Sequence, residues 1–383
     1  MKKLFTIILC FLLFTQALPV TADAPSLSIK AKACLLMEAS TGQVLYESNI
    51  HEKLPPASVT KIMTMLLTME AIDRGQIAFE DIVTASENAK RMGGSTIFLD
   101  TGEQMSVYDL MKGIAVASGN DACVAMAEYL SGSESAFVER MNARAAELGM
   151  ADTHFVNCNG LPCDGHVTSA YDIALMSRAL LAHERIFEFT TIWVDSLRGG
   201  KFALANTNKL IRFYEGANGL KTGSTDDALY CLSATAKRND MQLIAVILGA
   251  PTTKDRFNGA RALLDYGFAT YSLSHPAEST LPIQEVPVEK GTKSTVGLRY
   301  GEDTSILLEK EKLSRMESRV ETTNGLTAPV KAGDAAGTAQ FYADGNLLGT
   351  VPLVAAEDVP RKSFGRIFLD LLQRWSGVYR KNA

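Results

Sequence analysis

The sequence predicts an α/β (α+β) body in which helices cover an antiparallel sheet, followed by a small all-β domain and a C-terminal amphipathic helix. Three observations indicate this arrangement: a strand-prone hairpin near the N-terminus, a run of helical patterns in the middle, and three strand-prone segments after residue 219. A chain of 383 residues is also longer than one ordinary domain. We therefore expect two folded units with terminal extensions.

The first elements are a hairpin and a helix. Ala33–Met37 and Gln43–Glu47 are β-prone and flank the turn Thr41-Gly42, which predicts the hairpin. A helix is predicted from Ser58 to Asp73, with Gly75 as its end. It is apolar on almost every face, which is typical of a helix inside a large core.

The rest of this body alternates helices and then strands. Helical patterns cover Val107 to Ala117, Asp121 to Leu130, Ser135–Leu148 and Ser169–Ala182. Three strands follow in antiparallel succession, Leu220–Gly223, Ala228–Lys237 and Met241–Gly249, and a helix from about Lys254 to Tyr271 closes the unit. The hairpin and the three strands could form one sheet, with the intervening helices covering it.

The chain becomes rich in turns and strands from about Leu273. Candidate strands are Thr295–Tyr300, Ile306–Lys310 and Gln340–Tyr342, and Asp344-Gly345 is a type I′ hairpin signal. These segments predict a small all-β domain that contains no convincing catalytic cluster.

The N-terminus has the layout of a secretory signal peptide. Lys2 and Lys3 precede an apolar run from Leu4 to Leu13, and small residues lie at Ala22 and Ala24. Cleavage after either alanine fits this pattern, and an uncleaved anchor is the alternative.

After Pro360 the sequence predicts an amphipathic helix. Its apolar residues recur at helical spacing: Phe364, Ile367, Phe368, Leu371, Leu372, Trp375 and Val378. Its basic residues are Lys362, Arg366, Arg374, Arg380 and Lys381, with Asp370 as the single acid. Such a helix suits an anionic membrane surface, and the alternative is a helix docked on its own protein.

Composition limits the possible partners and cofactors. A net charge of -5 gives no reason to expect nucleic acid. The five histidines show no His-Glu-x-x-His spacing, and we expect neither a metal nor a cofactor. Outside the signal segment, which contains Cys10, an odd number of cysteines remains, which argues against a full disulfide framework. The sequence leaves undecided whether Cys158 and Cys163 form a disulfide bond.

Three short motifs occur in order, and the first is Ser58-Val59-Thr60-Lys61. Its spacing places Ser58 Oγ and Lys61 Nζ on one helix face, one turn apart. A serine hydroxyl needs a base to become a nucleophile, and a lysine can be that base when burial lowers its pKa. The helix N-terminus also offers N–H groups that can hold an oxyanion.

The second motif, Ser118-Gly119-Asn120, lies at the corner between two predicted helices. Ser118 could relay protons between Lys61 and a leaving amine. Asn120 offers a donor and an acceptor, enough to hold both the lysine and a substrate amide.

The third motif is Lys221-Thr222-Gly223, on the first of the late strands. If this strand lies at an edge, it can pair with an extended peptide. Lys221 and Thr222 can bind a C-terminal carboxylate, and Gly223 leaves room where substrate approaches closely. Ser224 could offer its backbone N–H as a second oxyanion donor.

Each motif alone has an ordinary explanation as a helix cap, a turn or a strand end. The ordered triple is far more specific, because it is the signature of penicillin-binding proteins and class A β-lactamases. Flanking residues strengthen the match: Pro55-Pro56-Ala57, Gly93-Gly94-Ser95 and Asn218-Gly219-Leu220. The chain resembles low-molecular-mass penicillin-binding proteins that act as D-alanyl-D-alanine carboxypeptidases, of the sporulation-associated Gram-positive type. The middle motif has glycine where class A β-lactamases have aspartate, which fits the carboxypeptidase group.

The resemblance implies the penicillin-binding/β-lactamase-like transpeptidase fold and a two-step acyl transfer without a cofactor. Ser58 would attack the bond between the two terminal D-alanines of a peptidoglycan stem peptide, and water would release the acyl-enzyme. Lys61 would be the base, with Ser118 and Asn120 as proton relay and substrate holder. Arg256 matches a family arginine near the carboxylate pocket. β-Lactam antibiotics would acylate the same serine.

The resemblance also implies domain limits and a location. Residues 1–24 would be the signal peptide, 25–272 the serine peptidase domain, 273–356 the small β-rich domain and 357–383 the membrane-associating helix. The protein would be exported and would act at the outer face of the cytoplasmic membrane or in the cell-wall space. A β-lactamase or transpeptidase using the same site, or a non-catalytic wall-binding protein, are the alternatives.

Overall fold

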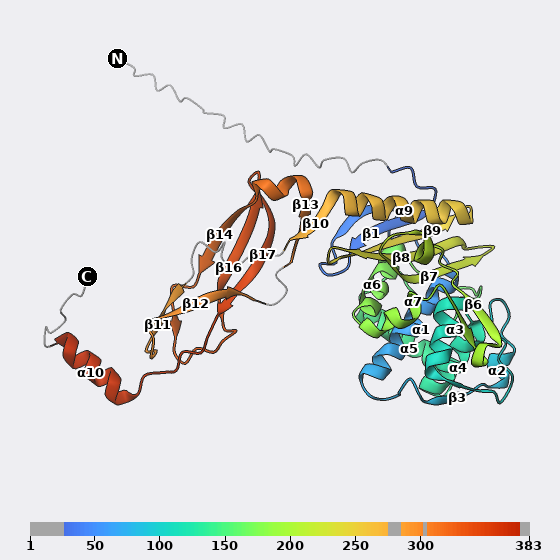
Figure 1. Ribbon diagram of the computed structural model, residues 1–383, viewed down its shortest axis with the longest axis horizontal. Coiled ribbons are helices and arrows are strands. Elements are labelled where there is room, and N and C mark those ends of the chain that lie inside the picture. The colour runs from blue at the N-terminus through green and yellow to red at the C-terminus, as the bar shows by residue number, and fades with distance from the viewer. Residues whose placement is uncertain (1–26, 275–284, 302–304, 376–383) are drawn as a thin grey trace, which may run out of the picture.

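A computed structural model describes residues 27–274, 285–301 and 305–375 (Figure 1). The predicted signal peptide and the last predicted positions of the C-terminal helix, from residue 376 onward, lie outside these described residues.

The first unit is built on a five-stranded antiparallel sheet with the order β2-β1-β9-β8-β7. Its strands are β1 (Ala33–Glu38), β2 (Val44–Ser48), β7 (Ala217–Thr225), β8 (Leu229–Arg238) and β9 (Met241–Ala250). The predicted hairpin and the three predicted late strands therefore do form one sheet. The strand β7 lies at its edge, as the third motif requires.

Helices cover both faces of this sheet. The helix α9 (Thr253–Thr270) packs on one face, and Figure 1 shows most of the other helices of this unit grouped on the other. The main helices of that group are α1 (Lys61–Asp73), α3 (Val107–Ala117), α4 (Asn120–Ser131), α5 (Glu134–Glu147) and α6 (Ala170–Leu181). Two apolar cores separate the three layers, one under α9 and a larger one around α1. The predicted layered body is confirmed.

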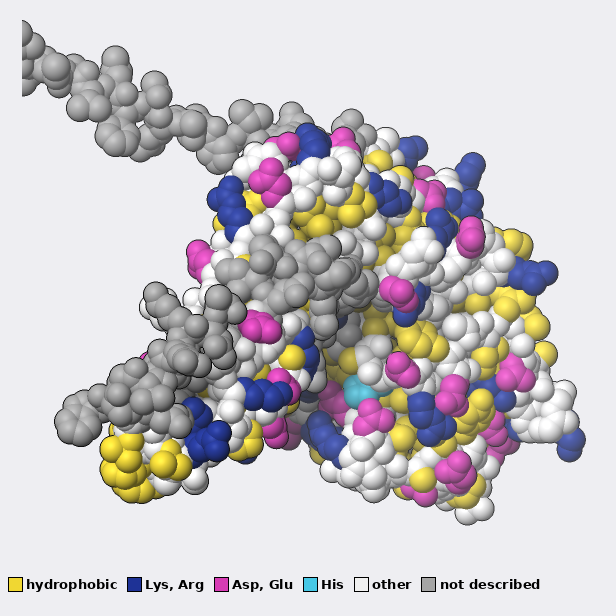
Figure 2. All heavy atoms as spheres, turned by 60° about the vertical axis from the view of Figure 1, so that its left-hand side comes forward, with side chains coloured by type: hydrophobic (Ala, Val, Ile, Leu, Met, Phe, Trp, Pro, Cys, Tyr) yellow, Lys and Arg dark blue, Asp and Glu magenta, His cyan; other side chains and the backbone are white. Residues whose placement is uncertain are grey.

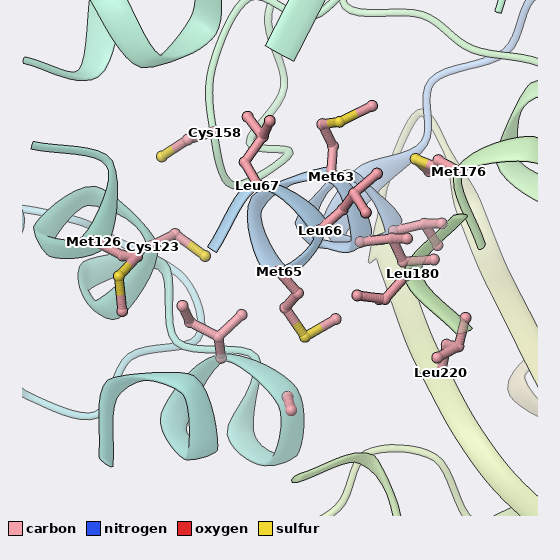
Figure 3. Packing of buried hydrophobic residues seen from close by; sticks show 14 of the residues in the cluster. Met63, Met65, Leu66, Leu67, Cys123, Met126, Cys158, Met176, Leu180 and Leu220 are labelled. Atoms are coloured by element: carbon pink, nitrogen blue, oxygen red, sulfur yellow. The ribbon is translucent and has the colours of Figure 1, made fainter. Parts of the chain in front are cut away.

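The helix α1 lies at the centre of the larger core (Figure 3). Every residue from Lys61 to Ala71 is buried, which agrees with the apolar sequence of this segment. Its side chains point in several directions, toward Cys123 and Met126 of α4 on one side and Met176 and Leu180 of α6 on another. Full burial of each leucine or methionine contributes about 1.5–3 kcal/mol, so α1 is a firm platform for the residues at its start.

Several short elements were not predicted. They are β3 (Ile82–Thr84) with β4 (Gln104–Ser106), β5 (Val194–Leu197) with β6 (Phe202–Ala205), α2 (Glu87–Lys90), α7 (Phe187–Thr190) and α8 (Leu210–Phe213). Segments of three or four residues are too short to show a helical or strand period, so the pattern contained no signal for them.

The second unit is all-β and has its own apolar core. A six-stranded sheet has the order β14-β16-β17-β12-β11-β15, and β10 (Tyr271–Ser274) pairs with β13 (Ile306–Glu309). The six strands are β11 (Glu285–Glu289), β12 (Thr295–Tyr300), β14 (Glu317–Thr322), β15 (Leu326–Thr327), β16 (Ala335–Ala343) and β17 (Asn346–Ala355). Asp344 and Gly345 join β16 to β17 with φ of 51° and 80°, the positive values of the predicted type I′ turn.

The helix α10 (Phe364–Trp375) follows the β domain and lies at the far end of the molecule from the α/β body (Figure 1). Its apolar side chains are exposed: Phe364, Phe368, Leu369, Leu371 and Leu372. Figure 2 shows hydrophobic side chains gathered at the lower left, with lysine and arginine side chains beside them. In the part of the chain that the structure describes, no helix has both the length and the apolar character to cross a membrane.

Candidate active site

Ser58 lies in a short 3-10 turn, Ala57–Thr60, that leads into α1. The prediction that the α-helix begins at Ser58 is therefore wrong by one turn, because α1 begins at Lys61. Ala57 has φ of +49°, and the Thr60 hydroxyl donates to its carbonyl at 2.9 Å, which tightens the chain here. Ser58 itself is only half-buried, so its hydroxyl can meet a ligand.

Lys61 joins the first two motifs. Its Nζ donates to Ser58 Oγ at 3.0 Å and to Asn120 Oδ1 at 2.6 Å. A third acceptor is the carbonyl oxygen of Asn159, also at 2.6 Å. Three acceptors match the three N–H bonds of an ammonium, and a neutral amine would keep two of them while turning its lone pair to the serine hydroxyl. Burial lowers the pKa of Lys61, which favours that neutral form.

Asn120, the first residue of α4, is held on two sides. Its Nδ2 donates to the carbonyl of Gly93 and its backbone N–H to that of Ser95, each at 2.7 Å. Gly94 has φ of +73°, and a Cβ there would come 2.9 Å from Asn120 Nδ2. The Gly93-Gly94-Ser95 segment therefore fixes the orientation of the amide that faces Lys61.

Ser118 ends α3 in the left-handed conformation, with φ of 63°, and is buried. The structure places it two residues before Asn120, as the motif predicts. Its hydroxyl forms no hydrogen bond to another described residue, so it is not joined to Lys61 in this state. The predicted proton relay through Ser118 stays a prediction.

The third motif lies beside the serine turn, at the edge strand β7. Lys221 is 1% exposed and donates to the Thr222 carbonyl at 3.0 Å. Burial, reinforced by the nearby Lys61, lowers the pKa of Lys221 well below its usual value. The hydroxyl of Thr222 donates to that of Thr207 at 2.6 Å, and Ser224 is exposed at the end of the strand.

Gly223 has a different neighbour from the one predicted. A Cβ at this position would lie 2.9 Å from both the Pro56 carbonyl and the Ser58 backbone nitrogen. The missing side chain at Gly223 therefore lets the serine turn pack closely against β7. This is a separate reason for a glycine from the predicted one, which was to leave room for substrate. Gly223 thus sets the distance between the first and third motifs.

Arg256 on α9 is buried. Its Nη1 donates to the carbonyls of Gly223 at 3.1 Å and Cys231 at 3.3 Å, and its guanidinium packs over the rings of Tyr230 and Phe257. Burial lowers the pKa of Arg256 to about 10. Its Nε is buried and has no hydrogen-bond partner among the described residues.

Sequence reasoning missed the loop that completes the site. The carbonyl of Asn159 accepts from Lys61, and a backbone oxygen carries no residue-type signal that a sequence could show. The available hint was Asn157-Cys158-Asn159-Gly160, a turn-forming run in which Asn157 Oδ1 accepts from the Gly160 N–H at 2.7 Å.

The cysteines near the site are free thiols. Cys158 is buried and Cys163 is exposed, and they are not bridged. Cys123 has no exposed surface, and burial raises its pKa to about 12, so alkylating reagents should react poorly with it. The described residues contain no group of three or more side chains that could hold a metal ion.

These contacts form a single site. In it a buried lysine joins a half-buried serine to an asparagine, next to an edge strand. The family model for D-alanyl-D-alanine carboxypeptidases (Peptidase_S11) matches residues 19–252, more than half of the chain. The chain belongs to this carboxypeptidase family. A second model, the C-terminal domain of penicillin-binding protein 5, matches residues 271–361. The resemblance read from the three motifs is confirmed, and with it the serine-type carboxypeptidase class.

Individual relatives agree with the family. D-alanyl-D-alanine carboxypeptidase DacF of Bacillus subtilis is 45% identical over 93% of this chain and 91% of its own. The crystal structure of penicillin binding protein 5 from Haemophilus influenzae has a TM-score of 0.78 and 32% identity, covering 88% of this chain and 99% of that one. Penicillin-Binding Protein D2 from Listeria monocytogenes, in its ampicillin-bound form, has a TM-score of 0.59 and 32% identity, covering 64% of this chain and all of that one. The predicted transpeptidase-type fold is confirmed.

Proposed function

We propose that this carboxypeptidase removes the terminal D-alanine from peptidoglycan stem peptides through an acyl-enzyme on Ser58. The observation that carries the assignment is the placement of Lys61 Nζ, buried and 3.0 Å from Ser58 Oγ. In the first step the neutral lysine takes the hydroxyl proton while Ser58 Oγ bonds to the carbonyl carbon of the penultimate D-alanine. The lysine then carries the proton that the leaving amine needs.

The remaining motifs hold the substrate. Asn120 orients the lysine with its oxygen and keeps a second amide N–H for the peptide, because Gly93 takes only one. Lys221, Thr222 and Arg256 lie together at β7 and bind the terminal carboxylate. The N–H groups of Ser58 and Ser224 hold the oxyanion.

The first step ends as the C–N bond breaks and Lys61 returns its proton to the departing D-alanine amine, with Ser118 as the relay. The second step consumes water. Lys61 then takes a proton from water, whose oxygen attacks the ester carbonyl, and Ser58 recovers its proton as the ester bond breaks. β-Lactams acylate the same serine because their amide carbonyl presents the same target, in keeping with the ampicillin-bound relative.

Localisation and domain limits are part of the same proposal. The N-terminal segment 1–24 directs export, and residues 25–272 and 273–356 are the peptidase and β domains. Residues 357–383 attach the protein to the outer face of the cytoplasmic membrane. Support for the attachment comes from the exposed apolar side chains of α10.

Mass spectrometry of a synthetic pentapeptide ending in D-Ala-D-Ala tests the activity. The protein should release one D-alanine per peptide and should be labelled on Ser58 by a fluorescent penicillin. Ser58→Ala should lose both signals, whereas Ser135→Ala, a change of the same size at an exposed serine of α5, should keep both. D-Alanine release by the Ser58→Ala variant would contradict the mechanism.

A further inference from the structure

One loop fastens the start of α1 at three successive points. Residues 153–168, called the site loop below, are closed by a bridge between His154 and Val167, and Thr168 bridges to Leu54 outside the loop. The carbonyl of Asn159 accepts from Lys61, and that of Cys158 accepts from the Thr64 hydroxyl at 2.6 Å. The third fastening is a side-chain contact, 2.8 Å between His166 Nε2 and the Thr60 hydroxyl.

The partners of His166 define its tautomer. Its Nδ1 accepts from the Val156 backbone N–H at 3.0 Å, so the ring proton is on Nε2 and is donated to Thr60 Oγ1. The single hydroxyl proton of Thr60 is then free to go to the Ala57 carbonyl, 2.9 Å away. His166 is 4% exposed, and burial lowers its pKa to about 4, with nearby His154 acting in the same direction. The imidazole is therefore neutral, as this chain of hydrogen bonds requires.

This series of hydrogen bonds ends at Ala57, the residue before Ser58. Ala57 has φ of +49°, a left-handed conformation that a residue with a Cβ keeps only where its surroundings hold it. The site loop also presses on Ala57 directly, because a Cβ on Gly160 would lie 1.9 Å from the Ala57 carbonyl oxygen. Ala57 in turn orients the backbone of Ser58.

We propose that His166 is a positioning residue for the acyl-transfer reaction. It donates to Thr60, which holds Ala57 and so the Ser58 turn, while the same loop holds Lys61 through Asn159. The imidazole thereby fixes the serine and its base to one frame, and it acts through Thr60. This inference rests on the proposed roles of Ser58 and Lys61.

The test is the rate of acylation by a fluorescent penicillin at saturating concentration. His166→Ala and Thr60→Val, which keeps the branched shape of threonine, should each lower this rate by about 10- to 100-fold, because small displacements of reacting groups have effects of that size. The penicillin concentration that gives half of the maximal rate should change little, because Lys221, Thr222 and Arg256 are untouched. A purely structural loss would lower the melting temperature without this split.

Three further variants make the result specific. His166→Gln keeps an N–H that can reach Thr60 and should recover most of the rate. The double variant His166→Ala/Thr60→Val should acylate no more slowly than the slower single variant, because both changes break one connection. His154→Ala, at an exposed histidine of the same loop, is the matched control and should acylate normally.

Two results would overturn the inference while leaving the proposed function in place. In the first, His166→Ala or Thr60→Val is acylated as fast as the unmodified protein. In the second, the fold-losses in acylation rate of the two single variants multiply in the double variant. If the unmodified protein itself is not labelled on Ser58, the proposed function fails first and the role of His166 falls with it.

Discussion

The amine of Lys61 lies 2.6 Å from Asn120 Oδ1, closer than its 3.0 Å contact with Ser58 Oγ. The asparagine therefore orients the amine, and in the proposed mechanism the proton moves across the longer contact. A base aimed in this way must be able to lose its own proton. The pKa of Lys61, lowered by burial, provides for this.

Lys61→Arg should abolish acylation while the fold is kept. A guanidinium stays protonated near neutral pH, so it can pair with Asn120 but cannot accept the serine proton there. We expect penicillin labelling to slow by at least about 100-fold, the lower end of the range for general-base catalysis. Circular dichroism and the melting temperature report whether the fold is intact. Rapid labelling of this variant would mean that another group is the base.

The acylation rate should rise with pH through the lowered pKa of Lys61. In the proposed mechanism the neutral amine is the active form, so activity should be lost as pH falls below that pKa and present above it. Stopped-flow labelling between pH 5 and pH 11 measures the profile. A midpoint near the usual lysine pKa would show that burial does not tune this amine.

The main sheet, the long helices and the three motifs could be predicted because each has a local signal. Strands and helices of ten residues show their period, and Ser58, Lys61 and Lys221 belong to a recognisable ordered set. The 3-10 turn at Ala57 could not be predicted, because the left-handed conformation of an alanine depends on the distant Thr60–His166 connection. The role of Asn159 was hidden for a similar reason, since its contribution is a main-chain oxygen.

Gly223 illustrates a prediction that named the right residue for an incomplete reason. The sequence indicates a close approach at a glycine, but which partner approaches depends on how β7 packs against a turn that is far away in the chain. Contacts of this kind are set by tertiary structure and carry no local pattern.

Gly223→Ala should therefore damage the nucleophile as well as the strand. The new Cβ would lie 2.9 Å from the Ser58 nitrogen, and either the turn or β7 must shift. We expect a loss of about 1–3 kcal/mol in the free energy of unfolding, as for other overpacked sites, together with slower acylation. Chemical denaturation and penicillin labelling measure the two effects. Gly365→Ala, where an added Cβ meets nothing within 4 Å, is the control. If Gly223→Ala changes neither the free energy of unfolding nor the acylation rate, the turn adapts freely to the added Cβ.

Arg256→Gln should weaken recognition of the substrate's free carboxylate. The arginine lies against Gly223 of the third motif through its Nη1, and its guanidinium charge is a natural partner for a carboxylate bound there. We expect kcat/KM for the pentapeptide to fall by about 10- to 100-fold, the loss of one charged hydrogen bond. The same peptide with an amidated C-terminus should be a poor substrate for both proteins, with little difference between them. An equal loss for both peptides would mean that Arg256 acts by holding Gly223 and not by binding the carboxylate.

Removal of the chain after Pro360 should release the protein from membranes without lowering its peptidase activity. The helix α10 exposes Phe364, Phe368 and Leu371, at 85%, 53% and 59%, and it lies away from the α/β body that contains the active site. An apolar face with basic neighbours binds anionic vesicles by burying side chains among the lipids and by charge. The full-length protein should sediment with such vesicles, and the truncated form should stay in the supernatant. Phe368→Ser with Leu371→Ser should weaken sedimentation in the full chain, whereas Leu347→Ser, an exposed leucine of the β domain, should not. If the truncated protein still sediments, another surface makes the membrane contact.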